Sequence, residues 1–279
     1  MGGHREAPMR TGDGDFHNRS STGGLTTLQG FSPPSLRVGC SGWQYKHWRG
    51  DFYPADLPVS RWLEYYSSRF DTVEINNSFY RLPDTRTFDR WRERVPPGFL
   101  YAVKASRYIT HMKKLKDVDA SVELLLSRLA QLNRALGPVL YQLPPRWPLN
   151  LQRLTAFLQM LPPHLTHVVE FRDPAWYVED VFEALATHGA SLCLHDMEGA
   201  ATGLRLVGPA VYIRFHGPTK YHGTYASDAL AVPAAWCAER LAEGVPVYAY
   251  FNNDAGGHAP RDAARFRELT RLAHTAADG

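Results

Sequence analysis

The 279-residue sequence lacks any apolar run close to the roughly 20 residues that a membrane-spanning helix needs, which predicts a soluble protein. It has only three cysteines, Cys40, Cys193 and Cys237, and no Cys-x-x-Cys spacing, so a disulfide scaffold and a cysteine zinc site are both disfavoured. Unpaired cysteines are typical of a reducing compartment, and we expect a cytoplasmic location. We interpret Cys193 as a small buried residue rather than a nucleophile.

The sequence also lacks a charge of one dominant sign, because 31 Lys and Arg stand against 28 Asp and Glu. This balance does not dictate a polyanionic partner. Residues 1–35 are rich in Gly, Ser, Thr and Arg, mix both charges, and contain no apolar segment of the kind found in secretory signals. We therefore expect residues 1–35 to be a disordered tail and residues 36–275 to form one folded domain.

The remainder of the chain alternates short β-rich runs with helical patterns. The β-rich runs are residues 36–42, 72–79, 99–105, 138–143, 167–172, 191–195, 210–216 and 246–252. Helices are expected at residues 58–69, 84–95, 117–136, 150–161, 178–188, 227–243 and 260–274. Only the connection at 199–209 has too much Gly and Pro for a full helix and predicts a turn or loop.

This alternation predicts parallel strands joined by right-handed crossovers. Eight units in about 240 residues match a closed (β/α)8 barrel, the TIM barrel. An open doubly wound sheet is disfavoured, because its central strands would be apolar on both faces and a glycine fingerprint is absent after the first strand. The predicted fold is a single-domain TIM barrel with a disordered N-terminal tail.

Seven of the β-rich runs carry polar or ionisable residues on alternate positions near their C-terminal ends, where TIM barrels place their chemistry. In TVEINNSF, Val73 and Ile75 share one face, which leaves Glu74 and Asn76 on the other. The same parity selects Lys104, Gln142, Glu170, Arg172, His195, Arg214, His216 and Asn252. These ten side chains should converge if the barrel closes, although the short run LCLHDME places either His195 or Asp196 in the lumen.

Several blocks between about residues 36 and 272 also resemble the domain of unknown function 72 family, the YecE-like TIM-barrel proteins. The blocks are GCSGWQYKHWRGDFYPADLP, VEINNSFYRLP, AVKASRYITH, LGPVLYQLPP, VEFRDPAWY, YIRFHG and YFNNDAGGHAPRDA. The resemblance implies a TIM-barrel fold, which the alternation predicts separately. It implies no agreed reaction, cofactor or catalytic residue, so the function has to come from the chemistry of the site.

Three cations, Lys104, Arg172 and Arg214, lie on the third, fifth and seventh runs, and inward residues of alternate strands share a layer in a TIM barrel. A buried charge left unpaired costs several kcal/mol, so anionic groups must lie among them. Glu74 and Glu170 would supply these groups in a structural ion-pair network, whereas a ligand would supply them in an anion site. We favour the anion site.

The loops 216–225 and 252–260 follow the last two strands, a common phosphate site in TIM barrels. Their glycines and Lys220 favour a phosphorylated ligand, whereas Asp254 would repel one, so a carboxylate-bearing ligand stays open as the second possibility. Turn chemistry alone also explains the glycines.

Proton transfer is assigned to carboxylates, imidazoles and a lysine at the mouth: Glu74, Lys104, Glu170, His195 and His216. Lys104 is interpreted first as an electrostatic clamp and second as a nucleophile. Substrate contacts are assigned to Trp43, Asn76, Tyr80, Gln142, Arg172, Asp196, Arg214, Lys220, Asn252 and Asn253. The aromatic residues among them either pack together or stack on a flat ligand.

The leading hypothesis is a cytoplasmic hydrolase or isomerase/lyase that acts on a small anionic substrate, phosphorylated or not, at the C-terminal mouth. One alternative is a non-catalytic protein that binds a nucleotide or nucleic acid. Others are a metal-dependent phosphodiesterase and a glycosidase with Glu74 and Glu170 as its carboxylate pair. Because no His-x-His or His-Glu-x-x-His motif is present and fixed cations would compete with a metal, no cofactor and no metal ligand is predicted.

Overall fold

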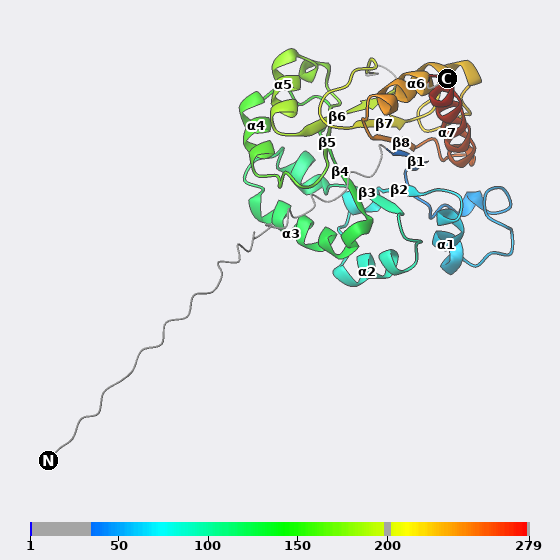
Figure 1. Ribbon diagram of the computed structural model, residues 1–279, viewed down its shortest axis with the longest axis horizontal. Coiled ribbons are helices and arrows are strands. Elements are labelled where there is room, and N and C mark those ends of the chain that lie inside the picture. Colours follow the sequence, from blue (N-terminus) through cyan, green and yellow to red (C-terminus); the bar gives the residue numbers. More distant parts are fainter. Residues whose placement is uncertain (2–34, 198–201, 278–279) are drawn as a thin grey trace. The chain divides into compact units, whose positions relative to one another are not determined.

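A computed structural model describes Met1 and residues 35–197 and 202–277 of the chain. Eight parallel strands form one sheet in the order β1-β8-β7-β6-β5-β4-β3-β2 (Figure 1). The strands are β1 (Leu36–Cys40), β2 (Thr72–Ile75), β3 (Leu100–Lys104), β4 (Leu136–Gln142), β5 (His167–Glu170), β6 (Ala190–His195), β7 (Val211–Phe215) and β8 (Val247–Phe251). All eight predicted strands are present, and the TIM-barrel fold is confirmed.

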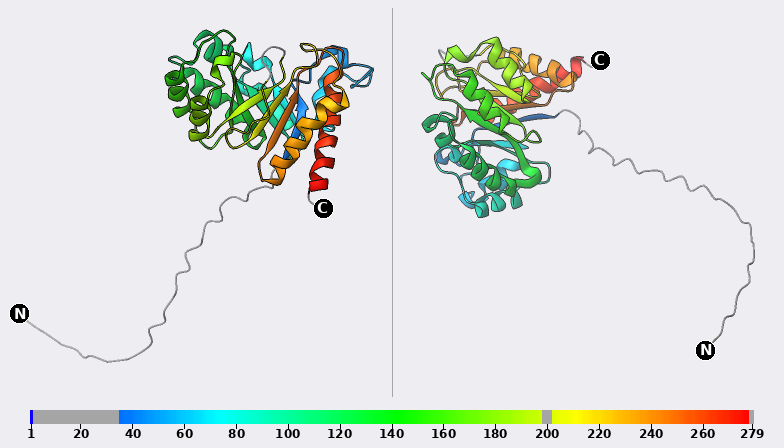
Figure 2. Two further views of the ribbon diagram at one scale, coloured as in Figure 1. Left: turned by 90° about the horizontal axis from the view of Figure 1, so that it is seen from above. Right: turned by 90° about the vertical axis from the view of Figure 1, so that its left-hand side faces the viewer.

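Helices lie outside the strands and connect them (Figures 1 and 2). They are α1 (Trp62–Ser67), α2 (Thr85–Glu93), α3 (Asp119–Leu129), α4 (Leu151–Gln159), α5 (Glu179–Thr187), α6 (Ser227–Ala242) and α7 (His258–Ala277). The part of the predicted loop 199–209 that the structure describes, residues 202–209, contains no helix, as predicted. None of the described helices has the length and apolar character needed to cross a lipid bilayer.

The shorter helical turns lie at the ends of strands and helices. They are the 3-10 turns Lys46–Trp48, Val59–Arg61, Asn77–Phe79, Ala130–Ala135 and Pro174–Trp176, and the π-helical turn Tyr108–Met112. Asp84 accepts a 2.8 Å hydrogen bond from the Thr87 backbone N–H and so caps α2, as expected for an aspartate at this position. The predicted tail, apart from Met1 and Ser35, lies outside the described residues.

The barrel interior consists of an apolar floor with a polar layer above it. The floor is one residue from each of six strands: Ala102, Leu140, Val168, Cys193, Tyr212 and Tyr250. Two residues further along β3 to β7, on the same face, the side chains become polar. This polar layer comprises Lys104, Gln142, Glu170, His195 and Arg214, together with Glu74 of β2 and Arg172 just past β5, which pair with its members. The parity that the sequence predicted therefore places these polar residues at the C-terminal end of the barrel.

The ring of strands closes between β1 and β2 through a side chain. The Tyr66 hydroxyl accepts a 2.8 Å hydrogen bond from the Cys40 N–H of β1 and donates a 3.0 Å bond to the Thr72 carbonyl of β2. Gly39 permits this approach, because a Cβ atom there would lie 2.2 Å from the Thr72 oxygen. The β1–β2 seam thus depends on a tyrosine supplied by α1.

The aromatic residues of the long loop after β1 pack against one another. Tyr53 stacks on Trp62 with ring centroids 4.7 Å apart, and both side chains are buried. Trp43 is also buried and meets Trp91 edge to face at 5.2 Å. Packing, one of the two interpretations drawn from the sequence, therefore describes most of this cluster.

Candidate functional site

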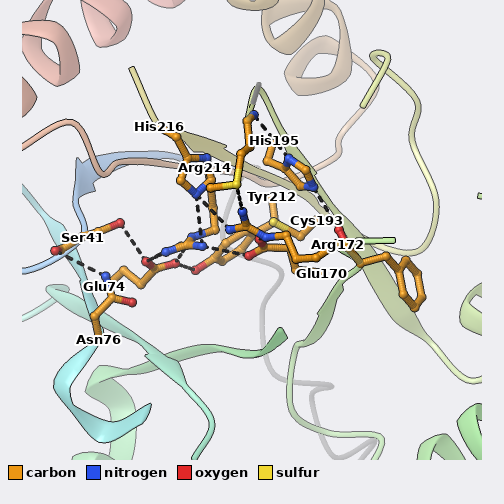
Figure 3. A network of polar contacts seen from close by, with 12 residues as sticks. Ser41, Glu74, Asn76, Glu170, Arg172, Cys193, His195, Tyr212, Arg214 and His216 are labelled. Atoms are coloured by element: carbon orange, nitrogen blue, oxygen red, sulfur yellow. Dashed lines mark hydrogen bonds and ion pairs between the residues drawn. The ribbon is translucent and has the colours of Figure 1, made fainter. Parts of the chain in front are cut away.

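The polar layer is organised around Arg214, whose side chain is 1% exposed (Figure 3). Its Nη2 and Nε donate to the Glu74 carboxylate at 2.8 Å and 3.0 Å, and its Nη1 donates to Glu170 Oε2 at 2.8 Å. Both glutamates are fully buried. The guanidinium group of β7 thus joins a carboxylate from β2 to one from β5 across the barrel, which is the convergence that the parity predicted.

Glu74 has no unsatisfied oxygen. Besides Arg214, Oε1 accepts a 2.7 Å hydrogen bond from the Ser41 hydroxyl and Oε2 accepts a 2.6 Å bond from the Tyr212 hydroxyl. Burial alone would raise the pKa of Glu74, but the charge of Arg214 and these hydrogen bonds hold it below its usual value. Glu74 is therefore an ionised group that fixes Arg214, and it is a poor proton acceptor.

Glu170 is ionised for the same reason. It pairs with Arg214 and with Arg172, which lies two residues beyond it on the same face. The two guanidinium charges overcome the effect of burial and hold the pKa of Glu170 far below its usual value. The structural ion-pair network, which the sequence left as an alternative to an anion site, is therefore present among these residues.

His216 lies directly above the two arginines (Figure 3). Its Nε2 is 3.1 Å from Arg172 Nη2 and 3.4 Å from Arg214 Nη1, and since a guanidinium group only donates, Nε2 is an acceptor. Its Nδ1 is 3.4 Å from Asp196 Oδ1. Burial lowers the pKa of His216 to about 4, although Asp196 acts in the opposite direction. The imidazole is accordingly neutral at neutral pH.

The structure answers which of His195 and Asp196 adjoins the polar layer. His195 continues the inward parity of Cys193, its ring lies 5.9 Å from that of His216, and its Nε2 is 3.0 Å from the Phe171 carbonyl. Asp196 instead accepts hydrogen bonds from the His216 N–H at 2.7 Å and from the Tyr225 hydroxyl. His195 is therefore part of the layer, while Asp196 anchors the loop that follows β7.

Lys104 differs from the two arginines because it has no ion pair or hydrogen bond from its Nζ to any residue that the structure describes. The Nζ lies over the Phe79 ring, 4.3 Å from its centroid, and the residue is partly exposed at the mouth. Burial and then the charge of Arg214 lower the pKa of Lys104 to about 8. The layer thus contains three cations and two buried carboxylates. Both carboxylates pair with the arginines, so Lys104 has no carboxylate partner among the described residues.

Of the other predicted contact residues, Gln142 belongs to the layer and Asn76 and Trp43 lie beside it. Asn76 is near it, with Nδ2 3.4 Å from the Ser41 carbonyl, and Gln142 is paired in register with Glu170. A cavity of about 220 Å³ opens beside Asn76. Its other lining residues are Ser41, Gly42, Trp43, Gln44, Tyr45 and Asn77. This cavity brings Trp43, a predicted contact residue, to the edge of the layer.

Asn253, Lys220 and Tyr80 are not part of the layer. Asn253 is fully buried and donates to the Gly223 carbonyl at 2.9 Å and to Asp262 at 2.8 Å, so it ties the last two loops together. Lys220 is exposed beside Tyr221. Tyr80 is 72% exposed on the loop after β2. No side-chain contact draws Asn252 into the layer among the described residues.

The glycine-rich loops predicted to cradle phosphate use backbone N–H groups internally. The Gly217 N–H donates to the Tyr225 hydroxyl at 2.5 Å, and the Gly257 N–H donates to the Asp254 carbonyl at 2.9 Å. Both glycines have positive φ angles, 95° and 74°. These contacts favour turn chemistry, the simpler of the two interpretations that the sequence allowed.

Three residues of the site were missed by the sequence analysis. Tyr212 has the same strand parity as Arg214 and His216, so that signal was available. Ser41 lies just beyond β1, the one strand for which no polar parity was recognised. His111 lies in the π-helical turn after β3, where no periodic pattern identifies it, and burial with the charge of Lys104 lowers its pKa to about 4.

The family described as "Protein of unknown function DUF72" matches residues 37–278. The chain belongs to this family. The chain is 29% identical over 155 residues to the UPF0759 protein YecE of Escherichia coli K12, a match that spans 55% of the chain and about half, 54%, of that protein. It is 25% identical over 278 residues to the UPF0759 protein YunF of Bacillus subtilis 168, covering 86% of the chain and 96% of YunF.

Crystal structures of family members share the fold. The chain matches the protein of Thermotoga maritima with a TM-score of 0.76 and 27% identity, over 85% of the chain and 99% of that structure. A family protein of Enterococcus faecalis matches with a TM-score of 0.73 and 17% identity, over 85% and 96%. The fold expected from the resemblance is therefore confirmed, and the family description gives no reaction.

Within residues 35–197 and 202–277, no three side chains of His, Cys, Asp or Glu gather in a way that could hold a metal ion. His216 and Glu170, two groups at the mouth that could ligate a metal, instead contact the guanidinium groups of Arg172 and Arg214. No reaction step is therefore assigned to a metal.

Proposed function

We propose that the C-terminal mouth of the barrel is an enzyme site for a small anionic substrate, in which Lys104 contacts the anion and exchanges a proton with the substrate. The observation that supports this most directly is the isolation of Lys104. The residue is partly exposed and its ammonium group has no carboxylate partner among the described residues, whereas the arginines beneath it are held by Glu74 and Glu170.

The ion network beneath Lys104 defines its chemistry. Arg214 and Arg172 are fixed positive charges, so they disfavour a third positive charge nearby and attract an anionic substrate group. Near pH 8 an appreciable fraction of Lys104 would be the neutral amine, which can accept a proton from carbon or add to a carbonyl group. Because no protein carboxylate pairs with Lys104, a carboxylate or phosphate of the substrate would be its ion-pair partner.

Among the reaction classes that the sequence predicts, this geometry favours proton abstraction of the isomerase/lyase type over hydrolysis. Glu74 is ionised and fully hydrogen-bonded, and Glu170 is ionised and paired with two arginines, so neither is placed to activate water. His216 Nε2 already accepts from two arginines. Lys104 is therefore the proton acceptor that the arrangement supports best.

The reactivity of Lys104 can be tested without knowing the substrate. Pyridoxal 5′-phosphate is an anionic aldehyde whose carbonyl condenses with an amine to give an imine and water, and borohydride reduces the imine to a stable secondary amine. At pH 7.5 we expect peptide mass spectrometry to show Lys104 labelled about tenfold faster than Lys113 or Lys116, because more of it is neutral. Equal labelling of the three lysines, or failure of inorganic phosphate to protect Lys104, would contradict the anion site.

Catalysis is tested separately by solvent exchange. A panel of small keto acids and sugar phosphates in D2O, followed by proton NMR, should reveal a compound whose carbon-bound hydrogen exchanges in the presence of the protein. Exchange should be lost in both Lys104→Met and Lys104→Arg, while Lys104→Arg keeps the charge and hence the anion affinity. Exchange that survives in Lys104→Arg would assign the base elsewhere.

A second candidate, single-stranded nucleic-acid binding, is favoured by the surface beside the mouth. The Arg107 guanidinium lies 5.8 Å from the ring of the exposed Tyr80, and Lys113 Nζ lies 5.8 Å from that of Tyr108, which is 42% exposed. Interleaved cations and exposed rings suit base stacking and backbone contact. This candidate expects oligonucleotide affinity that falls steeply with salt and is lost in Tyr80→Ala, whereas the enzyme proposal expects Tyr80→Ala to leave exchange intact.

A further inference from the structure

A second basic site lies on the outer wall of the barrel, between α1 and α7 and away from the polar layer. Two adjoining cavities of about 370 Å³ and 340 Å³ share the side chains of Arg69, Phe70 and Arg267. The first cavity extends toward Phe52 and Tyr65. The second extends past Arg37, Asp71, Gly98 and Arg271, at the N-terminal ends of the first three strands. Together the two cavities form one groove, which we call the arginine groove.

The arginine groove has a surplus of positive charge. Five arginines line it, but only two carboxylates do. Asp51 pairs with Arg261, and Asp71 pairs with Arg37 at 2.9 Å. Arg69, Arg267 and Arg271 have no ion pair with any described residue. Neither Glu64, which pairs with Arg61 and Arg94, nor Glu268 lines either cavity.

Two of the unpaired guanidinium groups are held in place by aromatic rings rather than by carboxylates. Arg267 lies over Phe70 at 5.3 Å, and its Nη1 donates to the Arg69 carbonyl at 2.9 Å. Arg69 lies over Tyr65 at 5.1 Å. Stacking of this kind orients a guanidinium group while leaving most of its N–H donors available. The groove is thus preorganised for an anion at low cost in side-chain entropy.

The helix geometry aligns the third cation with the other two. Arg267 and Arg271 are four residues apart on α7, and residues at this spacing lie on the same face of a helix. Pro260 and Ala264 on that face line the aromatic end of the groove. The arginine groove therefore has two chemically different ends. One is lined by aromatic and small apolar side chains, and the other by a row of arginines.

We propose that the arginine groove binds a nucleoside polyphosphate, with its phosphates along Arg69, Arg267 and Arg271 and its base against the partly exposed rings of Phe52 and Tyr65. A guanidinium group presents paired donors that match phosphate oxygens, and aromatic side chains stack on a base. The size of each cavity is within the range of nucleotide-sized pockets, roughly 300 to 1,000 Å³. The proposal is independent of the function proposed for the mouth, since no lining residue belongs to the polar layer.

The test is isothermal titration of the full chain with ATP at low salt, compared with tripolyphosphate and AMP. We expect saturable ATP binding with a Kd below about 1 mM, and clearly weaker binding of tripolyphosphate, which lacks the base, and of AMP, which lacks the phosphate row. Arg271→Gln should weaken ATP binding about tenfold. Its side chain makes no hydrogen bond to a described residue, so the variant should fold normally. Arg267→Gln should have a similar or larger effect.

Arg86→Gln is the matched control, because Arg86 is an exposed arginine on α2 without an ion pair to a described residue. Its ATP affinity should equal that of the wild type. The proposal is overturned if ATP does not bind saturably, if Arg271→Gln and Arg267→Gln both bind like Arg86→Gln, or if Lys104→Met alone removes binding, which would place the nucleotide at the mouth. Equal affinity for ATP and tripolyphosphate would overturn the role of the aromatic end.

Discussion

The polar layer and the arginine groove both contain several arginines, but only the layer pairs its arginines with buried carboxylates. In the layer, Arg214 is 1% exposed and its donors are shared between two buried carboxylates. In the groove, Arg69 and Arg271 are exposed and have no carboxylate partner among the described residues. Burial of a guanidinium group demands internal partners, whereas water screens an exposed one. Buried arginines therefore shape a site, and exposed ones remain available to a ligand.

The sharpest contrast should come from Arg214→Met in the layer. The substitution leaves the buried charges of Glu74 and Glu170 without their shared partner, so we expect the free energy of unfolding to fall by about 3 to 5 kcal/mol. Urea denaturation monitored by circular dichroism measures this loss. The double variant Arg214→Met with Glu74→Gln removes one of the stranded charges and should recover part of it. A loss below about 1 kcal/mol would show that the layer is hydrated rather than buried.

Lys104→Met, in contrast, should stabilise the protein. The folded-state pKa of about 8 lies below the ordinary value of 10.5, so the protonated lysine disfavours folding at neutral pH. We expect Lys104→Met to raise the free energy of unfolding by about 1 to 3 kcal/mol at pH 7. Wild-type stability should also increase between pH 8 and pH 10.5, and this increase should be absent in Lys104→Met. Destabilisation by Lys104→Met would indicate a protein partner for the ammonium group.

Acid should weaken the layer before its carboxylates are protonated. His216 is buried and neutral, with a pKa of about 4 against an ordinary value of 6.5, so the unfolded chain binds more protons in that interval. Stability should fall by about 1 to 2 kcal/mol between pH 7 and pH 5 because of this residue. His216→Asn should flatten the decline when urea midpoints are compared at the two pH values. An unchanged slope would assign the acid sensitivity to other histidines.

The smallest effect is expected in the groove. Arg271→Gln and the control Arg86→Gln should each change the free energy of unfolding by less than about 0.5 kcal/mol, because neither side chain makes an ion pair with a described residue. Thermal unfolding without ligand measures this. With ATP present, the wild type and Arg86→Gln should melt at a higher temperature, and Arg271→Gln should gain less. A large loss of stability without ligand would make Arg271 a structural residue.

The fold was predictable because it depends on patterns that repeat along the chain. Period-two alternation located Glu74, Lys104, Glu170 and Arg214 on the inward face, and strand direction then brought them to one end. This reasoning extended to Arg172 and His216, which lie just past their strands but keep the same parity.

The partners of these residues were not predictable, because pairing depends on distances across the barrel rather than on neighbours in sequence. The sequence left open whether Glu74 and Glu170 or a ligand would neutralise the cations. Only the structure shows that Arg214 donates hydrogen bonds to both glutamates. Similarly, nothing in the pattern of Asn253 distinguishes a ligand contact from the buried loop tie that it makes.

The seam between β1 and β2 affects when the first strand can pair with the rest of the sheet during folding. Within the part of the chain that the structure describes, backbone pairing attaches β1 only to β8, the last strand in the sequence, so the first strand gains a ladder only when residues 247–251 are present. The β1 ladder can therefore form only after all eight strands have been synthesised, which makes its pairing a late step in completing the barrel.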